Sequence, residues 1–123
     1  MYSEEAKKNI LNMILLEVFT VSDRGYQARV WIRGEGPECD SYDDTVCNFF
    51  QSIDSVLKDY RNFYISDSQY KILSDFKNVF EEFCDGPGVD YYLPENFINS
   101  SEWLHVVNLA KVVLKEFNYP TKK

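Results

Sequence analysis

Residues 29–44 read RVWIRGEGPECDSYDD. In this stretch a basic, aromatic segment ends at two glycines and a proline and gives way to carboxylates, and no lysine or arginine follows until Lys58. Gly34 and Gly36 reach positive φ freely, while Pro37 fixes its own φ and disfavours a helical conformation of the residue before it. We therefore expect a rigid, non-helical corner, followed by a negatively charged surface.

The segment before this corner fits two secondary structures. Residues 26–33 alternate apolar and polar side chains, which predicts a strand in a β-hairpin at about 14–33. Residues 22–25 form a turn, in which Asp23 or the serine before it can also cap a helix that Gly34 ends. A lone hairpin is marginal unless it packs against helices, and the chain offers no further strand candidate. We favour the helix and keep the hairpin as the alternative.

Helical spacing of apolar residues organises the rest of the chain. The first two expected helices cover residues 4–19, after a cap at Ser3, and residues 41–60, after a cap at Ser41. The next helix begins at the Ser66–Gln69 capping box and ends at Asp85. A short turn begins at Pro94, and a last helix runs from Ser100 or Ser101 to Asn118. The sequence therefore predicts an all-α fold with about five to seven helices in a single domain, 1–123; the hairpin would make it α+β.

Each predicted helix has one apolar face that defines the expected core. The core positions are Leu11, Ile14, Leu15 and Val18; Val46, Phe49, Phe50, Ile53, Leu57 and Tyr60, with Cys47 beside them; Leu73, Phe76, Phe80 and Phe83; and Trp103, Val106, Val107, Ala110, Val113, Leu114 and Phe117.

Composition limits the class of protein. The chain has 123 residues, 45% hydrophobic content, nine Phe, nine Tyr and two Trp, enough for one core without disulfides. Its three cysteines have no C-x-x-C spacing and indicate reduced thiols. The N-terminus lacks the charge pattern of a signal peptide, and the apolar run 10–21 is too short to span a bilayer. We expect a cytoplasmic protein that does not bind membranes.

The net charge of −7 is unevenly distributed. Two windows, residues 34–57 and 78–110, contain no lysine or arginine and carry twelve of the twenty acids. Such a surface repels nucleic acid and anionic membranes and attracts basic proteins. The alternative is that the carboxylates only keep the protein soluble.

The sequence offers little catalytic chemistry. His105 is the only histidine and falls on the surface or boundary of the last predicted helix, where a general base is the less favoured interpretation. One histidine with three scattered cysteines matches no zinc spacing. Asp40, Asp43 and Asp44 do not keep the spacing of a calcium loop and fit helix capping better. We expect no enzyme activity, no metal and no cofactor.

Protein recognition is the class that composition favours. The expected contact residues are Glu35, Glu38, Asp40, Tyr42, Asp43 and Asp44, with a second patch formed by Glu81, Glu82, Asp85, Asp90, Tyr91 and Tyr92. Tyrosine, tryptophan and arginine are frequent in interface hot spots. Trp31 and these tyrosines can also be core residues, and the sequence leaves this choice open.

The chain resembles small bacterial immunity proteins of contact-dependent growth inhibition systems and related polymorphic toxins. The resemblance rests on Arg29–Glu38, Asp40–Tyr42, Val46–Phe50, Leu93–Glu95, Phe97–Ile98, Glu102–Trp103 and Phe117–Tyr119, and spans about residues 25–119. It implies a cytoplasmic antitoxin that binds the toxic C-terminal domain of a delivered effector, often a nuclease, and blocks its active site or substrate groove.

The resemblance does not assign contact residues, so the candidates above rest on charge alone. Nuclease domains that grip phosphates tend to be basic, and an acidic inhibitor can mimic that substrate. We expect a basic toxin domain as the partner, no nucleic-acid binding, and a monomer or weak dimer when free. The alternative function is an acidic regulatory or adaptor domain that binds another basic protein.

Overall fold

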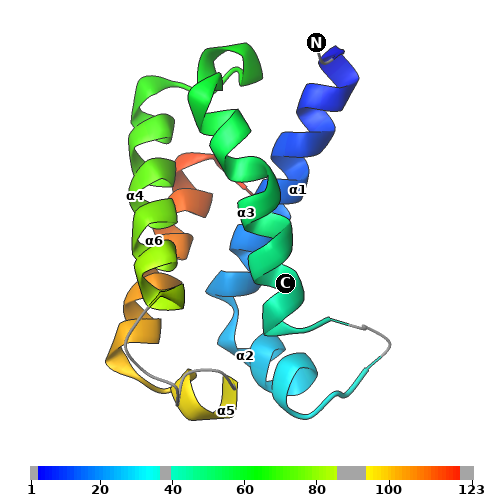
Figure 1. Cartoon of the computed structure of the whole chain (residues 1–123), viewed down its shortest axis with the longest axis vertical. Coiled ribbons are helices and arrows are strands. Elements are labelled where there is room, and N and C mark those ends of the chain that lie inside the picture. The colour runs from blue at the N-terminus through cyan, green and yellow to red at the C-terminus, as the bar shows by residue number, and fades with distance from the viewer. Residues whose placement is uncertain (1–2, 37–39, 86–93, 120–123) are drawn as a thin grey trace.

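The structure is a computed structural model that describes residues 3–36, 40–85 and 94–119 (Figure 1). These residues contain helices and no strand. The elements in chain order are α1 (Glu4–Ser22), α2 (Arg24–Tyr26), the π-helix η1 (Gln27–Ile32), α3 (Tyr42–Lys58), the 3-10 turn η2 (Tyr60–Phe63), α4 (Asp67–Cys84), α5 (Pro94–Phe97) and α6 (Ser101–Glu116). The predicted all-α fold is confirmed, and within these residues the hairpin alternative is wrong.

Serine side chains begin the four long helices. The hydroxyls of Ser3, Ser41, Ser66 and Ser100 each accept a hydrogen bond from a backbone N–H in the first turn of α1, α3, α4 and α6. At Ser66 the backbone N–H in turn donates to the Gln69 side-chain oxygen, which completes the predicted capping box. These bonds satisfy donors that a helix start otherwise leaves without partners.

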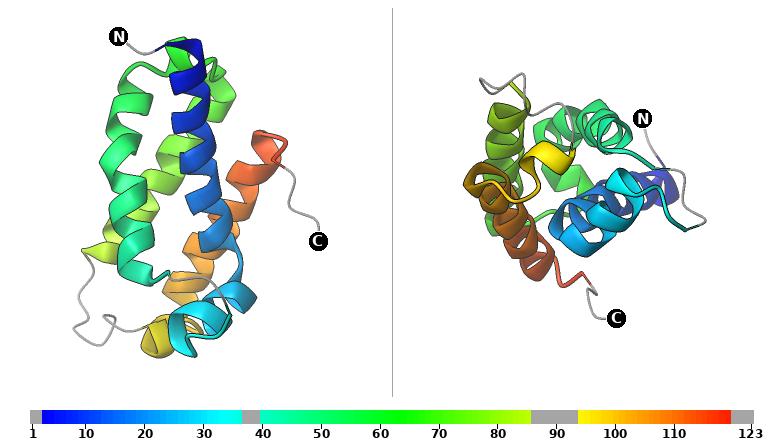
Figure 2. Two further views of the ribbon diagram at one scale, coloured as in Figure 1. Left: turned by 90° about the vertical axis from the view of Figure 1, so that its right-hand side faces the viewer. Right: turned by 90° about the horizontal axis from the view of Figure 1, so that it is seen from below.

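The four long helices run alternately up and down the long axis of the molecule (Figures 1 and 2). Helix α1 contacts α3 and α6, and α4 contacts α6 and α3. The core between them is rich in aromatic rings, and its largest fully buried side chains include Trp103, Phe49, Phe76, Phe80 and Phe97. Because each ring buries a large apolar area, this bundle has a continuous core despite its modest size.

The segment after α1 is helical because its side chains cap and anchor it. Asp23 accepts a hydrogen bond from the Tyr26 backbone N–H at 3.0 Å. The fully buried Gln27 donates to the carbonyl oxygens at the end of α1 and accepts a bond from the Trp103 indole. The expected turn at 22–25 is therefore limited to the junction at Asp23, since Arg24 already belongs to α2.

A glycine ends this helical segment, as the sequence predicts. Gly34 has a φ of +66° and Gly36 a φ of +95°, a region where residues with a Cβ are strained. Just before the corner, the Arg33 N–H donates to the Ala28 carbonyl at 3.1 Å, the wider spacing of a π-helix. Pro37 lies outside the described residues.

Helix α3 is rotated relative to the predicted face. Its fully buried side chains are Thr45, Phe49, Ile53 and Val56, whereas Val46, Phe50 and Leu57 are only half-buried. The helix ends at Lys58 rather than at 60, so the half-buried Tyr60 belongs to η2. Cys47 is exposed, so its prediction as a core residue is wrong. The apolar stripe of this helix is wide, and its contacts with α1 and α4 decide which edge is fully covered.

The other core predictions need small corrections. Leu11 and Phe83 are half-buried at the edges of the core, while Ile14, Leu15, Val18, Leu73, Phe76 and Phe80 are buried. On α6 every predicted position from Trp103 to Leu114 is buried, and only Phe117 at the end of the helix is half-buried. The regular helical spacing of these predicted residues explains this agreement.

Candidate functional site

Seven described acids of the two base-free windows lie on segments that meet at one end of the bundle. Tyr42 at the start of α3 contacts Cys84 at the end of α4, with 3.4 Å between the hydroxyl and the sulfur, and Phe97 of α5, with 4.9 Å between ring centroids. The start of α3, the end of α4, and α5 therefore form one end, at the bottom of Figure 1. We define the acidic end as Glu35, Asp40, Asp43, Asp44, Glu81, Glu82 and Asp85.

Asp43 and Asp44 are adjacent exposed acids of this surface. Both are exposed in the first turn of α3, where Ser41 caps the helix by accepting a hydrogen bond from the Asp44 N–H at 3.1 Å. Carboxylates are favourable at this position because the helix N-terminus carries partial positive charge. The local sequence thus holds two negative charges outward on a rigid element.

Asp40 and Tyr42 lie deeper than their neighbours. Asp40 is half-buried and accepts hydrogen bonds from the Tyr26 hydroxyl at 2.9 Å and the Trp31 indole N–H at 3.3 Å. The Tyr42 ring packs against Trp31 and Trp103. Burial raises the pKa of the Tyr42 hydroxyl, and the hydrogen bond with the Cys84 thiol raises it further. These side chains join η1 to α3, and Trp31 lies at the edge of the core.

Glu35 and Glu81 are exposed and pair with nearby cations. Glu35 lies 3.1 Å from the Arg33 guanidinium, and Glu81 lies 3.0 Å from the Lys77 ammonium one turn away on α4. Exposed pairs of this kind contribute only about 0–1 kcal/mol. Both carboxylates can therefore exchange these partners for groups on another protein at small cost.

The remaining predicted residues divide into two groups. Glu82 and Asp85 are exposed at the end of α4, beside Glu81. Negative charges are unfavourable at a helix C-terminus, by about 0.3–1 kcal/mol each when exposed. Glu38, Asp90, Tyr91 and Tyr92 lie outside the described residues.

Glu17 is a further acid near this surface that the sequence windows did not select. It is half-buried on α1, and Asn48 of α3 donates to its carboxylate at 3.5 Å. Burial, together with the charges of Asp40 and Asp44, raises the pKa of Glu17 to about 7. In the sequence, Glu17 is a single acid within the apolar run of α1. An ordinary exposed glutamate would produce the same pattern, so the sequence does not distinguish the two.

Glu17 opens onto a small cavity beside the acidic end. The cavity has a volume of about 270 Å³ and is lined by Leu16, Glu17, Phe19, Thr20, Asp23, Tyr26 and Asp40. Three of these residues are acids, contributed by α1 and by the segments that flank α2 and α3. The volume suits a single side chain better than a cofactor, since ligand pockets usually measure about 300–1,000 Å³.

Other site types find no support in the described residues. No group of three or more His, Cys, Asp or Glu within residues 3–36, 40–85 and 94–119 is arranged to hold a metal ion. His105 is exposed on α6, in line with its expected surface or boundary position. In the same part of the chain, no helix combines the length and apolar character needed to cross a membrane.

Comparison of the chain with protein-family models, with curated proteins and with solved structures gave no match.

Proposed function

We propose that this protein is a cytoplasmic immunity protein that binds and neutralises the toxic C-terminal domain of a contact-dependent growth inhibition effector. The partner in this proposal is a basic nuclease domain, and the acidic end is the contact surface. The acidic end carries the argument, because two distant acidic windows of the sequence form one surface there.

Charge gives this surface a partner preference and a kinetic advantage. A protein with net charge −7 that concentrates exposed carboxylates at one end steers basic proteins toward that end. Charge-steered pairs associate at up to about 10⁸–10⁹ M⁻¹ s⁻¹ at low salt, against about 10⁵–10⁶ without steering. Fast capture suits an antitoxin, which has to bind its toxin before the toxin reaches nucleic acid.

Inhibition in this proposal is steric and electrostatic. A nuclease groove that grips phosphates presents cations, and carboxylates held outward on the first turn of α3 can occupy the same positions. Asp43 and Asp44 are suited to this role because both are exposed on a rigid helix start. The protein performs no chemical step, and occupancy of the groove is sufficient.

Glu17 supplies a measurable sign of such binding. A lysine or arginine of the partner that enters the adjacent cavity would favour the charged carboxylate, and so would lower the pKa of Glu17 from about 7. Binding near neutral pH should then release a proton. Calorimetric titration in two buffers of different protonation enthalpy measures this release, and Glu17→Gln should abolish it.

The test of the proposal uses the toxin domain encoded immediately upstream of this gene. The two proteins should co-purify, and their association rate should fall as ionic strength rises from about 0.05 to about 0.5 M, over which the screening length shortens about threefold. Co-purification with a different basic protein, and none with the toxin domain, would support the adaptor alternative instead.

A matched pair of variants locates the contact surface. Asp43 and Glu5 are both exposed acids in the first turn of a long helix, and they lie at opposite ends of the bundle. Asp43→Lys should slow association with the toxin domain by about three- to tenfold, whereas Glu5→Lys should have a much smaller effect. Equal slowing by both variants would contradict the assignment of the acidic end.

A further inference from the structure

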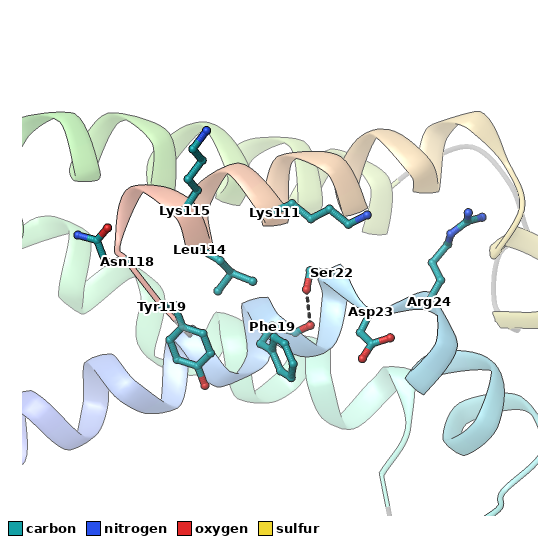
Figure 3. Close-up of a pocket in the computed structure, with 9 residues that line it drawn as sticks. All are labelled: Phe19, Ser22, Asp23, Arg24, Lys111, Leu114, Lys115, Asn118 and Tyr119. Atoms are coloured by element: carbon teal, nitrogen blue, oxygen red, sulfur yellow. Dashed lines mark hydrogen bonds between the residues drawn. The ribbon is translucent and has the colours of Figure 1, made fainter. Parts of the chain in front are cut away.

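A second concave site lies on the other side of α1 and carries the opposite charge. It is a groove of about 740 Å³ between the end of α1 with α2 and the C-terminal half of α6 (Figure 3). Its lining residues are Phe19, Ser22, Asp23, Arg24, Lys111, Leu114, Lys115, Asn118 and Tyr119. Because α1 contacts α3 on one side and α6 on the other, this helix separates the groove from the start of α3 (Figure 2).

Three cations border the groove on a chain whose net charge is −7. Lys111 and Lys115 are exposed on α6, and within the described residues neither forms an ion pair. Arg24 of α2 donates to the Ile98 carbonyl at 3.4 Å, which uses one of its five N–H groups. The one acid of the lining, Asp23, caps the Tyr26 N–H. The groove is thus a basic site on an acidic protein.

The floor of the groove is apolar. Leu114 is buried with 1% of its surface exposed, and the Phe19 and Tyr119 rings meet with their centroids 5.9 Å apart. At the same end, Asn118 is exposed with a φ of +54°. Figure 3 shows Asn118 at the end of the groove beside Tyr119, with its side-chain amide, which can both donate and accept, directed away from the other lining residues.

The arrangement of the cations favours an extended ligand over a compact one. Figure 3 shows Lys111 lying along the groove toward Arg24 and Lys115 pointing away from both. A single phosphate or carboxylate needs donors that converge on it, and these three spread along the length of the groove. The backbone positions of Lys111 and Lys115 lie about 6 Å apart along the axis of α6, and both exposed side chains begin from there. Side chains on one face of an extended peptide recur at about 6.6–6.8 Å, close to that spacing.

We propose that this groove binds an extended acidic segment of a partner protein, in which carboxylates at alternate positions meet Lys111 and Lys115 and an apolar side chain packs on Leu114 and Tyr119. Arg24 receives a carboxylate at the far end, and Asn118 bonds the peptide backbone. The site uses none of the residues of the acidic end, although Phe19 and Asp23 line both this groove and the cavity beside Glu17.

The test uses the folded full-length protein and a defined probe. The probe is an eight-residue peptide in which glutamate alternates with leucine, and the comparison peptide has glutamine in place of each glutamate. In a nuclear magnetic resonance titration, the glutamate peptide should shift amide signals over residues 19–24 and 111–119. The glutamine peptide should bind at least about tenfold more weakly, because only the glutamate peptide carries charge for the lysines.

Two double variants with equal net charge complete the test. Lys111→Glu with Lys115→Glu should weaken binding of the glutamate peptide at least about tenfold, since each position loses an attraction and gains a repulsion. Lys8→Glu with Lys58→Glu changes two exposed lysines elsewhere on the chain and should leave binding unchanged. Circular dichroism checks that both variants keep their helices.

Three outcomes would overturn the inference. They are equal peptide binding by the two double variants, peptide-induced shifts confined to residues outside the groove, and groove shifts produced by inorganic phosphate but not by the glutamate peptide. The last result would identify the groove as a small-anion site. None of these outcomes bears on toxin binding, so the groove and the proposed function can fail separately.

Discussion

Replacing Gln27 by leucine should lower the free energy of unfolding by about 3 kcal/mol. Gln27 is fully buried, and its amide nitrogen donates to the carbonyl oxygens of Thr20 at 2.9 Å and Val21 at 2.8 Å. Its amide oxygen accepts the indole N–H of Trp103 at 2.9 Å. One side chain therefore satisfies the end of α1 and ties α6 to it.

The magnitude follows from the groups that the substitution leaves without partners. The Thr20 oxygen keeps a backbone bond from Asp23 at 3.3 Å, so the main loss falls on the Val21 carbonyl and the Trp103 indole N–H. A buried polar group without a partner costs about 1–3 kcal/mol, and the greater hydrophobicity of leucine offsets a part of the total. The expected loss of about 3 kcal/mol is a large part of the free energy of unfolding of a typical protein, which is about 5–15 kcal/mol. The variant should nevertheless remain folded.

Urea unfolding followed by circular dichroism and tryptophan fluorescence measures the change. Gln51→Leu, at an exposed position of α3, is the control and should alter stability by less than about 0.5 kcal/mol. A double-mutant cycle with Trp103→Phe should show about 1–2 kcal/mol of coupling with Gln27→Leu. Additive effects in that cycle, or a Gln27→Leu effect no larger than that of the control, would refute the reasoning.

Three further predictions concern the half-buried Glu17, the buried Thr45 and the exposed Cys47. The folded state keeps the Glu17 carboxyl protonated up to a pKa of about 7, whereas the unfolded chain releases this proton near pH 4.5, so the free energy of unfolding should fall as pH rises from about 4.5 through 7. The expected fall is about 1 kcal/mol after discounting for solvent screening. Urea unfolding at several pH values measures it, and Glu17→Gln should remove it. Within the described residues the buried hydroxyl of Thr45 has no hydrogen-bond partner, so Thr45→Val should raise stability by about 1 kcal/mol, and destabilisation would contradict this. Cys47 is exposed, so maleimide should label its thiol in the folded protein. Cys47→Ser should change the free energy of unfolding by less than about 0.5 kcal/mol. A Cys47 thiol that reacts with maleimide only after unfolding would show that this residue is buried.

Local signals in the sequence predicted the helices well. A serine cap and its partner lie within three residues of each other, and the glycines at 34 and 36 need no distant contact to adopt positive φ. On α6 the predicted core residues from Trp103 to Leu114 keep regular helical spacing, although the apolar residues Leu104 and Val112 lie exposed outside that stripe. On α3 the apolar positions include both Val56 and Leu57, and the choice between them as the buried residue depends on where α1 and α4 lie.

Features that depend on distant contacts were not predictable from the sequence. Gln27 occupied a polar position of the alternating pattern, and its role depends on Trp103, 76 residues away. The pKa of Glu17 likewise depends on distant contacts, since burial and the charge of nearby Asp40 raise it, whereas the hydrogen bond from Asn48 of α3 lowers it. The sequence identified two acidic windows, but only the packing of α3, α4 and α5 brings the acids at the start of α3 and at the end of α4 to one end.

Growth rescue tests the immunity proposal most directly. The C-terminal domain of the protein encoded immediately upstream, the toxin in this proposal, is expressed in cells together with the native protein, with Asp43→Lys or with Glu5→Lys, at matched protein levels. We predict that the native protein and Glu5→Lys restore growth, and that Asp43→Lys restores it less at limiting expression. Failure of the native protein to restore growth, although it accumulates in folded form, would contradict the proposed function.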